Sequence, residues 1–437
     1  MAPLDPLNPA PAHTGAASPA LARVVSRWQL VPLAVGDVIG SGVYLLPAAA
    51  AALLGPLSVA AVILAGATVA LIVLCFAEAS SRFDEPGGAY LYTREAFGPF
   101  AGFEVGWMTW LSRVATLASV ANGFALATTF LWPAAASGLP RALLVAGPLV
   151  VFAAIHARGV RGGVGVSVTL VAVKLLPLFV FILGGLFAME PARLRVDAAP
   201  PVQAFGEAAL LLLFAYGGFE STSVAAGEFR NPQRDVPFAL LVMIVTVTAI
   251  YGLVQLVATG THPQLADSAS PLAEAAARFL GGWGGVLLSL GAMISILGLQ
   301  SNNTLNGPRY LYALARDGYG PAALARVHPR WRTPAIAIAF QTVVVVALAF
   351  TGSFVQLALL SVVARLATYA GTAAAVPRLR RLLPDDPRAV RLPGGSIIPR
   401  AALLLCIALA ASMGAANLLA GALALLVGAL LFLTRRR

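Results

Sequence analysis

The chain has 437 residues, of which 59% are apolar and 11% are charged, and its mean hydropathy is +0.85. An ordinary soluble domain carries about 25% charged residues, so this composition excludes a water-soluble globular protein and makes the lipid bilayer the expected surroundings. The formal net charge is +11, but the basic residues gather in alternate loops between apolar segments, which argues against a nucleic-acid-binding surface.

About twelve stretches are long enough, at roughly 20 apolar residues each, to cross a bilayer as helices. We therefore expect an all-α membrane protein with a single transmembrane domain over residues 23–435. Residues 1–22 are rich in Pro and Ala and are expected to form a disordered cytoplasmic tail. The expected spans are 28–53, 57–81, 100–132, 141–156, 163–188, 202–228, 236–259, 283–314, 334–350, 354–377, 399–415 and 417–434.

The basic residues predict the orientation of the chain. If the N-terminus is cytoplasmic, 21 of the 29 basic residues fall in cytoplasmic loops and ends. The opposite side then holds only four, which are Arg141, Arg193, Arg195 and Arg278. Cytoplasmic loops are enriched in Lys and Arg, so we expect both termini in the cytoplasm and an even number of spans.

Glycines interrupt two of these stretches. Gly40-Ser41-Gly42 falls within the first, and Ala215-Tyr216-Gly217-Gly218 falls within the sixth. A helix in lipid must satisfy its backbone hydrogen bonds internally, so a break at mid-membrane depth is costly unless the freed groups bind something. One glycine break alone has a simpler explanation, because glycine lets membrane helices approach closely. Two breaks in corresponding stretches favour a binding site instead.

The positions of the two breaks predict an internal repeat. The first and the sixth stretches are five spans apart, so their helices enter the membrane from opposite faces. Secondary transporters built from an inverted repeat of five plus five spans hold their substrate near the midplane, between such broken helices. We expect the first repeat over about 28–188, the second over about 202–377, and two extra helices over about 399–434.

The two breaks together predict a site for a zwitterion. The half-helix that begins near Val43 presents unpaired amides and the positive end of its dipole, which suit a carboxylate. The half-helix that ends near Tyr216 presents unpaired carbonyls, which suit an ammonium group. The expected ligand is a small α-amino acid. The residues expected to bind it are Ile39, Gly40, Ser41, Gly42, Val43, Thr116, Phe214, Ala215, Tyr216, Gly217, Gly218, Asn302 and Asn303.

Three ionisable residues, Asp37, Lys174 and Glu220, are expected in one layer beside the breaks. Such a residue costs roughly 2.5–3.5 kcal/mol on insertion scales and usually has a function. Lys174 is the only lysine of the chain, and a buried lysine can release its proton, whereas arginine cannot. We expect these residues to couple transport to protons or to gate it. The alternative is a permanent pairing of Lys174 with Asp37 or with a carbonyl of the first break. Arg113 and Arg365 are expected inside the bundle, and their roles and that of Asp37 stay open.

The positions of the cysteines and histidines predict no disulfide and no metal site. Cys75 and Cys406 fall within apolar spans, and none of the four histidines lies deep in one. We expect no disulfide, no metal and no cofactor. Without a catalytic cluster at one depth, the chain is not expected to be an enzyme.

Five further stretches stand out as motifs: Gly36 to Pro47, Pro86 to Tyr92, Phe97 to Phe103, Gly218 to Pro237 and Arg316-Asp317-Gly318. They resemble the amino acid–polyamine–organocation (APC) permeases, and the likeness covers nearly the whole chain. It implies the LeuT-like fold with broken helices 1 and 6, alternating access, and the bacterial cytoplasmic membrane as location. The phrase Val173-Lys174-Leu175 resembles the fifth span of sodium-independent members, in which a lysine ammonium takes the place of a sodium ion.

Departures from the family pattern narrow the range of expected substrates. In the arginine/agmatine antiporters that the chain resembles, aromatic residues of spans 6 and 8 stack on the guanidinium. Here the span 6 position is Phe214, but the span 8 position is Asn303. Half of the cation clamp is missing, which favours a neutral amino acid.

We therefore expect a secondary active transporter for a small, neutral L-amino acid, either proton-coupled or an exchanger. The alternative is a cationic amino acid or polyamine antiporter of the same fold, which would draw on Asp37 and Glu220. A channel or a membrane-embedded enzyme is less favoured. The sequence leaves open which amino acid is moved, whether transport is symport or exchange, and whether the protein forms a homodimer.

Overall fold

The computed structural model describes residues 26–83, 87–159, 164–196, 198–224, 231–384 and 389–434, and every regular element in these ranges is a helix. The tail expected at residues 1–22 lies outside the described residues. The long helices are α3 (Ser58–Ser80), α5 (Pro99–Thr128), α6 (Gly138–Ala157), α7 (Val164–Leu186), α10 (Pro232–Thr261), α12 (Gly282–Arg316), α13 (Ala335–Ala349), α14 (Phe354–Leu382), α15 (Ile397–Ala411) and α16 (Ala415–Leu433).

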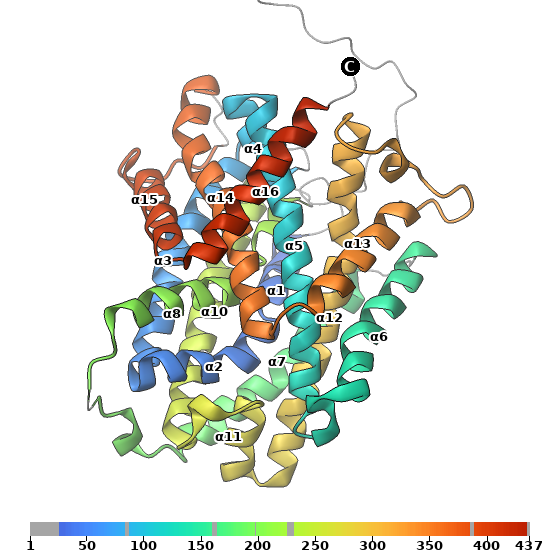
Figure 1. Ribbon diagram of the computed structural model, residues 1–437. Helices are drawn as coiled ribbons and strands as arrows, with labels where there is room; N and C mark the ends of the chain where they lie inside the picture. The colour runs from blue at the N-terminus through green and yellow to red at the C-terminus, as the bar shows by residue number, and fades with distance from the viewer. Residues whose placement is uncertain are drawn as a thin grey trace, which may run out of the picture.

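Shorter elements connect them or complete the broken helices. They are α1 (Arg27–Val38), α2 (Ser41–Leu54), α4 (Gly88–Phe97), α8 (Val202–Ala215), α9 (Glu220–Val224), α11 (Pro271–Leu280) and the 3-10 turns Gly55–Leu57, Pro133–Ala136, Pro191–Leu194, Leu265–Asp267 and Ala322–Ala325. α5 runs along the height of the bundle, with α4 near one end and α11 at the other (Figure 1).

The protein is a multi-pass membrane protein. By length and composition, six helical stretches in the described part of the chain are able to cross a membrane: 41–80, α6, α10, α12, α14 and α16. Shorter apolar helices, such as α8, α13 and α15, accompany them. The total of twelve spans and the inverted-repeat layout stay predictions.

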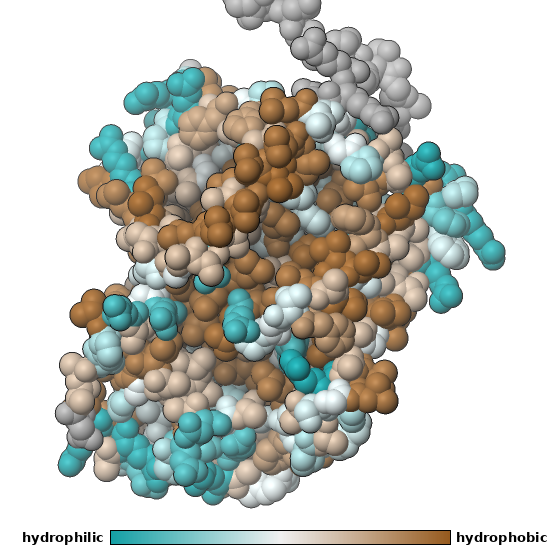
Figure 2. Space-filling model, in the orientation of Figure 1, coloured by the Kyte–Doolittle hydropathy of each residue, from teal (hydrophilic) through white to brown (hydrophobic). Residues whose placement is uncertain are grey.

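The outer helices present apolar side chains to the surroundings. Large exposed side chains of α16 include Leu419, Leu426 and Leu430. Figure 2 shows such apolar side chains over much of one face, and hydrophilic ones gathered at the lower end and along the edge. Because lipid tails are as apolar as leucine, this pattern suits the rim of a membrane bundle and needs no covering domain.

Both expected breaks are present, and they lie against each other. The first separates α1 from α2 at Ile39 and Gly40, and the second separates α8 from α9 at residues 216–219. α2 packs against α8, and α1 packs against α9. Gly42 and Gly218 allow this approach: a Cβ at Gly42 would lie 2.8 Å from the Cα of Ala215.

At Gly218 the constraint is twofold. Its φ is +124°, a conformation that side-chain-bearing residues rarely adopt, and a Cβ there would lie 2.3 Å from the carbonyl oxygen of Asp37. Tyr251 of α10 then joins the two breaks, because its hydroxyl lies 3.1 Å from the carbonyl oxygens of both Val38 and Ala215. One side chain of a third helix thus serves the ends of two half-helices.

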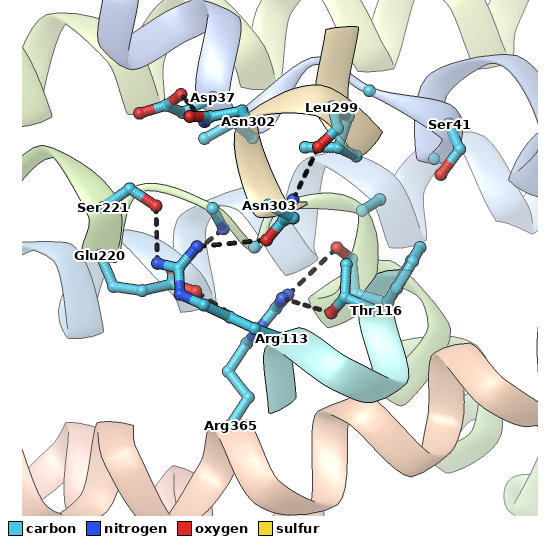
Figure 3. A pocket seen from close by; sticks show the side chains of 17 residues that line it. Asp37, Ser41, Arg113, Thr116, Glu220, Ser221, Leu299, Asn302, Asn303 and Arg365 are labelled. Atoms are coloured by element: carbon cyan, nitrogen blue, oxygen red, sulfur yellow. Dashed lines mark hydrogen bonds and ion pairs between the residues drawn. The ribbon is translucent and has the colours of Figure 1, made fainter. Parts of the chain in front are cut away.

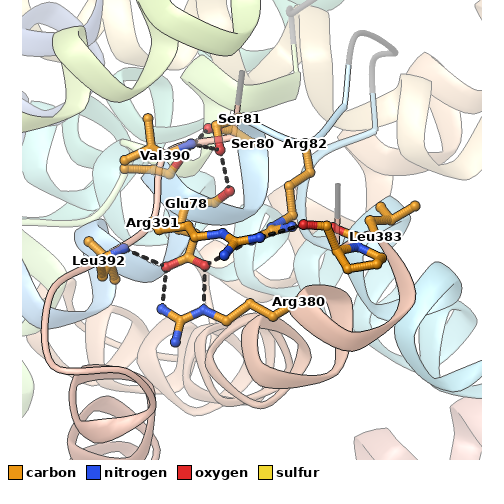
Figure 4. A network of polar contacts seen from close by, with 11 residues as sticks. Glu78, Ser80, Ser81, Arg82, Arg380, Leu383, Val390, Arg391 and Leu392 are labelled. Carbon is orange, nitrogen blue, oxygen red and sulfur yellow. Dashed lines mark hydrogen bonds and ion pairs between the residues drawn. The ribbon is translucent and has the colours of Figure 1, made fainter. Parts of the chain in front are cut away.

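A buried polar cluster joins α3, α14 and the segment before α15 (Figure 4). The fully buried Glu78 carboxylate accepts two hydrogen bonds of 2.6 Å from Arg380 and one of 3.2 Å from Arg82. The backbone amide of Leu392 donates to the same carboxylate at 3.0 Å, and Arg82 also donates to the carbonyl of Leu383. Because every partner is a charged or backbone donor, the carboxylate is compensated in spite of its burial.

Candidate substrate-binding site

A cavity of about 30 Å³ lies where the two breaks meet. Its walls come from both broken helices and from α5, α12 and α14 (Figure 3). Of the residues expected from sequence, it is lined by Asp37, Gly40, Ser41, Gly42, Thr116, Phe214, Ala215, Gly217, Gly218, Glu220, Asn302 and Asn303. The remaining lining residues are Val38, Arg113, Ser221, Leu299 and Arg365.

Four of the expected residues lie outside the cavity lining. Ile39 and Val43 are buried beside the first break. The Tyr216 hydroxyl points away, because it donates to the carbonyl of Val62 on α3 at 2.9 Å. Lys174 lies behind the first break and donates to the carbonyl oxygens of Gly36 and, at 2.7 Å, of Ile39.

The first break supplies donors. α2 begins at Ser41, and no side chain caps its first amides. These amides have no partner within the helix, and the helix dipole adds positive potential at this end. The buried Ser41 hydroxyl has no hydrogen-bond partner among the described residues. This end of the cavity suits an anionic group.

The second break differs from our expectation of unpaired carbonyls. The Phe214 carbonyl accepts a hydrogen bond from Arg365 at 3.4 Å, and the Ala215 carbonyl accepts one from Tyr251. Arg365 lies on α14 and Tyr251 lies on α10, and both are far from the second break in sequence. The residues of the break therefore do not predict these donors. A carbonyl has a second lone pair, but these two are not orphans.

Glu220 and Arg365 form one charged pair at the cavity. The Glu220 carboxylate lies 3.6 Å from Nε of Arg365, and it accepts hydrogen bonds from the Gly218 amide at 3.0 Å and the Tyr369 hydroxyl at 3.3 Å. Arg365 also donates to Thr116 at 3.1 Å. This pair therefore connects the second break to α5 and α14.

Asp37 and Arg113 have only neutral partners. Asn302 donates to Asp37 at 3.0 Å. Arg113 donates to Asn303 at 3.2 Å and to the Ser221 hydroxyl at 2.8 Å. Within the described ranges, no ion pair joins Asp37 to Lys174 or to Arg113. The cavity thus combines two carboxylates with two guanidinium groups.

A family model described as "Amino acid permease" matches residues 25–433. The chain belongs to the amino acid permease family of the APC superfamily. This permease is similar to the methylthioribose transporter of Bacillus subtilis (29% identity, covering 89% of this chain and 88% of that one). It is also similar to that organism's branched-chain amino acid permease (26%, covering 94% and 92%) and serine/threonine exchanger (31%, covering 71% and 72%).

Some residues of the permease site were not predicted from the sequence. The Tyr251 hydroxyl donates to carbonyls of both breaks, and the Tyr369 hydroxyl donates to Glu220 beside the second break. In sequence, nothing distinguishes these two tyrosines from ordinary aromatic residues of a membrane helix. Ser221 lies in the stretch Gly218 to Pro237 that carries the family resemblance, but nothing in the sequence assigns its side chain to the site. For Arg113 and Arg365 the sequence did give a signal, because a charged residue within an apolar stretch usually has a function.

Proposed function

We propose that this permease carries a small, neutral L-amino acid across the bacterial cytoplasmic membrane by alternating access, coupled to protons or by exchange. The observation that carries the proposal is the cavity at the meeting point of two broken helices, with helix-end amides on one side and charged groups of both signs around it. A zwitterion matches such a site, because each of its charges meets an opposite one.

The balance of charge favours a neutral substrate. Asp37 and Glu220 are offset by Arg113 and Arg365, which all line the same cavity. A cationic amino acid would bring a further positive charge next to the two guanidinium groups, at an unfavourable Coulomb energy. Two relatives are named for branched-chain amino acids and for serine/threonine, and two others are named cationic amino acid transporters, so the charge balance of the cavity carries this choice.

The second candidate is a cationic amino acid or polyamine antiporter. Asp37 favours it, since this carboxylate lines the cavity with a neutral partner and without a cation in contact among the described residues. Both candidates share the twelve-span, five-plus-five architecture with cytoplasmic termini that we propose for the chain.

The size of the cavity supports a conformational change when the substrate binds. About 30 Å³ accommodates roughly two water molecules, so an amino acid enters only after the lining side chains shift. In our proposal the lining residues of the two breaks, Gly40 to Gly42 and Phe214, Ala215, Gly217 and Gly218, hold the substrate backbone. Lys174, bound to the carbonyls of the first break, links their arrangement to protonation.

Uptake by the purified protein in proteoliposomes tests the proposal. We expect saturable uptake that prefers L- over D-enantiomers and is inhibited by serine, alanine or leucine more than by arginine or putrescine. Stimulation by an inward proton gradient indicates symport, and stimulation by internal amino acid indicates exchange. Inhibition mainly by arginine or putrescine supports the second candidate, and conductance without saturation contradicts both.

A further inference from the structure

Arg113 is buried in the wall of the cavity, and among the described residues no carboxylate is in direct contact with it, although Asp37 and Glu220 line the same cavity. It lies on α5 and is 6% exposed. Its contacts are the Asn303 side chain, the Ser221 hydroxyl and the ring of Tyr310, whose centre lies 5.3 Å from the guanidinium carbon. All three partners are neutral. By contrast, the nearby Arg365 faces the Glu220 carboxylate at 3.6 Å.

Arg113 also has unused hydrogen-bonding capacity. A guanidinium has five N–H donors, and two hydrogen bonds to side chains are present. Its Nε has no partner among the described residues. Figure 3 shows the guanidinium between Ser221 and Asn303, at the cavity. A buried, incompletely paired cation is costly, so an acceptor brought by a ligand would bind favourably here.

The other parts of an amino acid have better places in the same cavity. The carboxylate matches the amides at the start of α2 and the free hydroxyl of Ser41. The ammonium group matches Asp37, the cavity carboxylate that has no arginine in contact. Arg113 is then left for the third group of the substrate, its side chain.

We propose that Arg113 binds an oxygen of the substrate side chain, so that the permease selects small L-amino acids with a hydroxyl or amide group over apolar ones of the same size. This inference rests on the proposed function and narrows its substrate class. Serine, threonine and asparagine carry such an oxygen within a few atoms of the α-carbon, which makes them the expected substrates.

Competition between matched amino acids in proteoliposomes tests this inference. Serine and alanine differ by one hydroxyl, threonine and valine are isosteric, and asparagine and leucine have similar shapes. A hydrogen bond to a charged group corresponds to about a tenfold to hundredfold difference in affinity. We expect the inhibition constants of the wild-type protein to favour the polar member of each pair by at least about tenfold. In Arg113→Met each ratio should fall to near one.

Arg309→Met is the matched control, because Arg309 is exposed on α12 and lies outside the cavity lining. Its ratios should equal those of the wild type. Wild-type ratios near one, unchanged ratios in Arg113→Met, or a folded Arg113→Met protein that transports neither member of a pair would each overturn the inference. If Arg113→Met does not fold, the ratios of inhibition constants in the wild-type protein decide whether the inference holds. Saturable uptake without side-chain preference refutes this inference alone, whereas no saturable uptake of any amino acid refutes the proposed function as well.

Discussion

At the scale of single residues, the site depends on positions where any added atom would collide. A Cβ at Gly217 would lie 1.4 Å from a terminal nitrogen of Arg365, whose side chain occupies the space beside the second break. Arg365 in turn holds the Phe214 carbonyl and faces Glu220. The absence of a side chain at Gly217 is thus what allows the guanidinium to reach the break.

Gly217→Ala should therefore displace Arg365 and leave Glu220 without its charged partner. The Arg365 side chain is flexible, so the protein should fold, but its contacts with Glu220, Phe214 and Thr116 at the cavity change. We expect uptake in proteoliposomes to fall severalfold. Gly298→Ala is the control, because a Cβ at Gly298 meets no atom within 4 Å. Equal uptake by the two variants would contradict this account of the break.

Lys174 is the second residue whose chemistry is testable alone. Its ammonium group binds the Gly36 and Ile39 carbonyls at the end of α1, which are hydrogen bonds to a charged donor. We expect Lys174→Ala to reduce uptake by roughly tenfold or more and to abolish its response to a pH gradient. Lys174→Arg keeps a charge that cannot be released at neutral pH, so any uptake that it retains should be independent of the gradient.

Wild-type uptake with a wild-type pH response in Lys174→Ala would remove Lys174 from the coupling mechanism. A pH response that survives in Lys174→Arg, with uptake otherwise lowered, would assign Lys174 a purely structural role as a permanent cap of α1. That is the alternative that the sequence left open, with the carbonyls of the first break as partners.

At the scale of elements, the two breaks act as one unit because a third helix joins them. The Tyr251 hydroxyl of α10 lies 3.1 Å from a carbonyl at the end of α1 and from another at the end of α8. Movement of either half-helix therefore changes the hydrogen bond that serves the other. Alternating access requires coordinated movement of this kind.

Tyr251→Phe removes the hydroxyl and keeps the ring. A buried carbonyl without a partner costs about 1–3 kcal/mol, so we expect a lower midpoint of thermal unfolding in detergent and uptake reduced severalfold. Tyr312→Phe, on a less buried part of α12, is the control and should behave as wild type. A Tyr251→Phe protein as stable and active as Tyr312→Phe would show that the two breaks are not joined through α10.

At the scale of the whole molecule, the bundle is held together by buried charge as well as by apolar packing. The Glu78 cluster connects α3, α14 and the segment that leads to α15 (Figure 4), and none of its residues lines the cavity. Its side chains come from residues about 300 positions apart in the chain. Such a contact stabilises the arrangement of helices and leaves the substrate chemistry unaffected.

Glu78→Gln should lower the stability of the protein by roughly 3–5 kcal/mol, because it leaves the buried Arg82 and the partly buried Arg380 without a carboxylate. Thermal unfolding in detergent measures this loss. Glu95→Gln removes an exposed ion pair with Arg94 and should change stability by less than about 1 kcal/mol. The account of the cluster fails if the two variants unfold at the same temperature.

The amino-acid sequence by itself determined the membrane class, the helical content and the places where two helices break. These are local properties: each apolar stretch interacts with lipid through its own residues, and each break follows from its own glycines. The sequence also contained the family motifs, which supply Asp37, Ser41, Gly42 and Glu220 to the cavity lining, and the second glycine break, which supplies Phe214, Ala215 and Gly217.

Only the tertiary structure decided which partners these groups have. The carbonyls of Phe214 and Ala215 looked unpaired in sequence but bind Arg365 and Tyr251, and Tyr216 turned away from the site toward α3. Arg113 binds Asn303 and Ser221 and no carboxylate directly, although Asp37 and Glu220 line the same cavity. The physical reason is that pairing depends on the rotation and neighbours of helices far apart in the chain, which hydrophobicity and spacing along one segment do not specify.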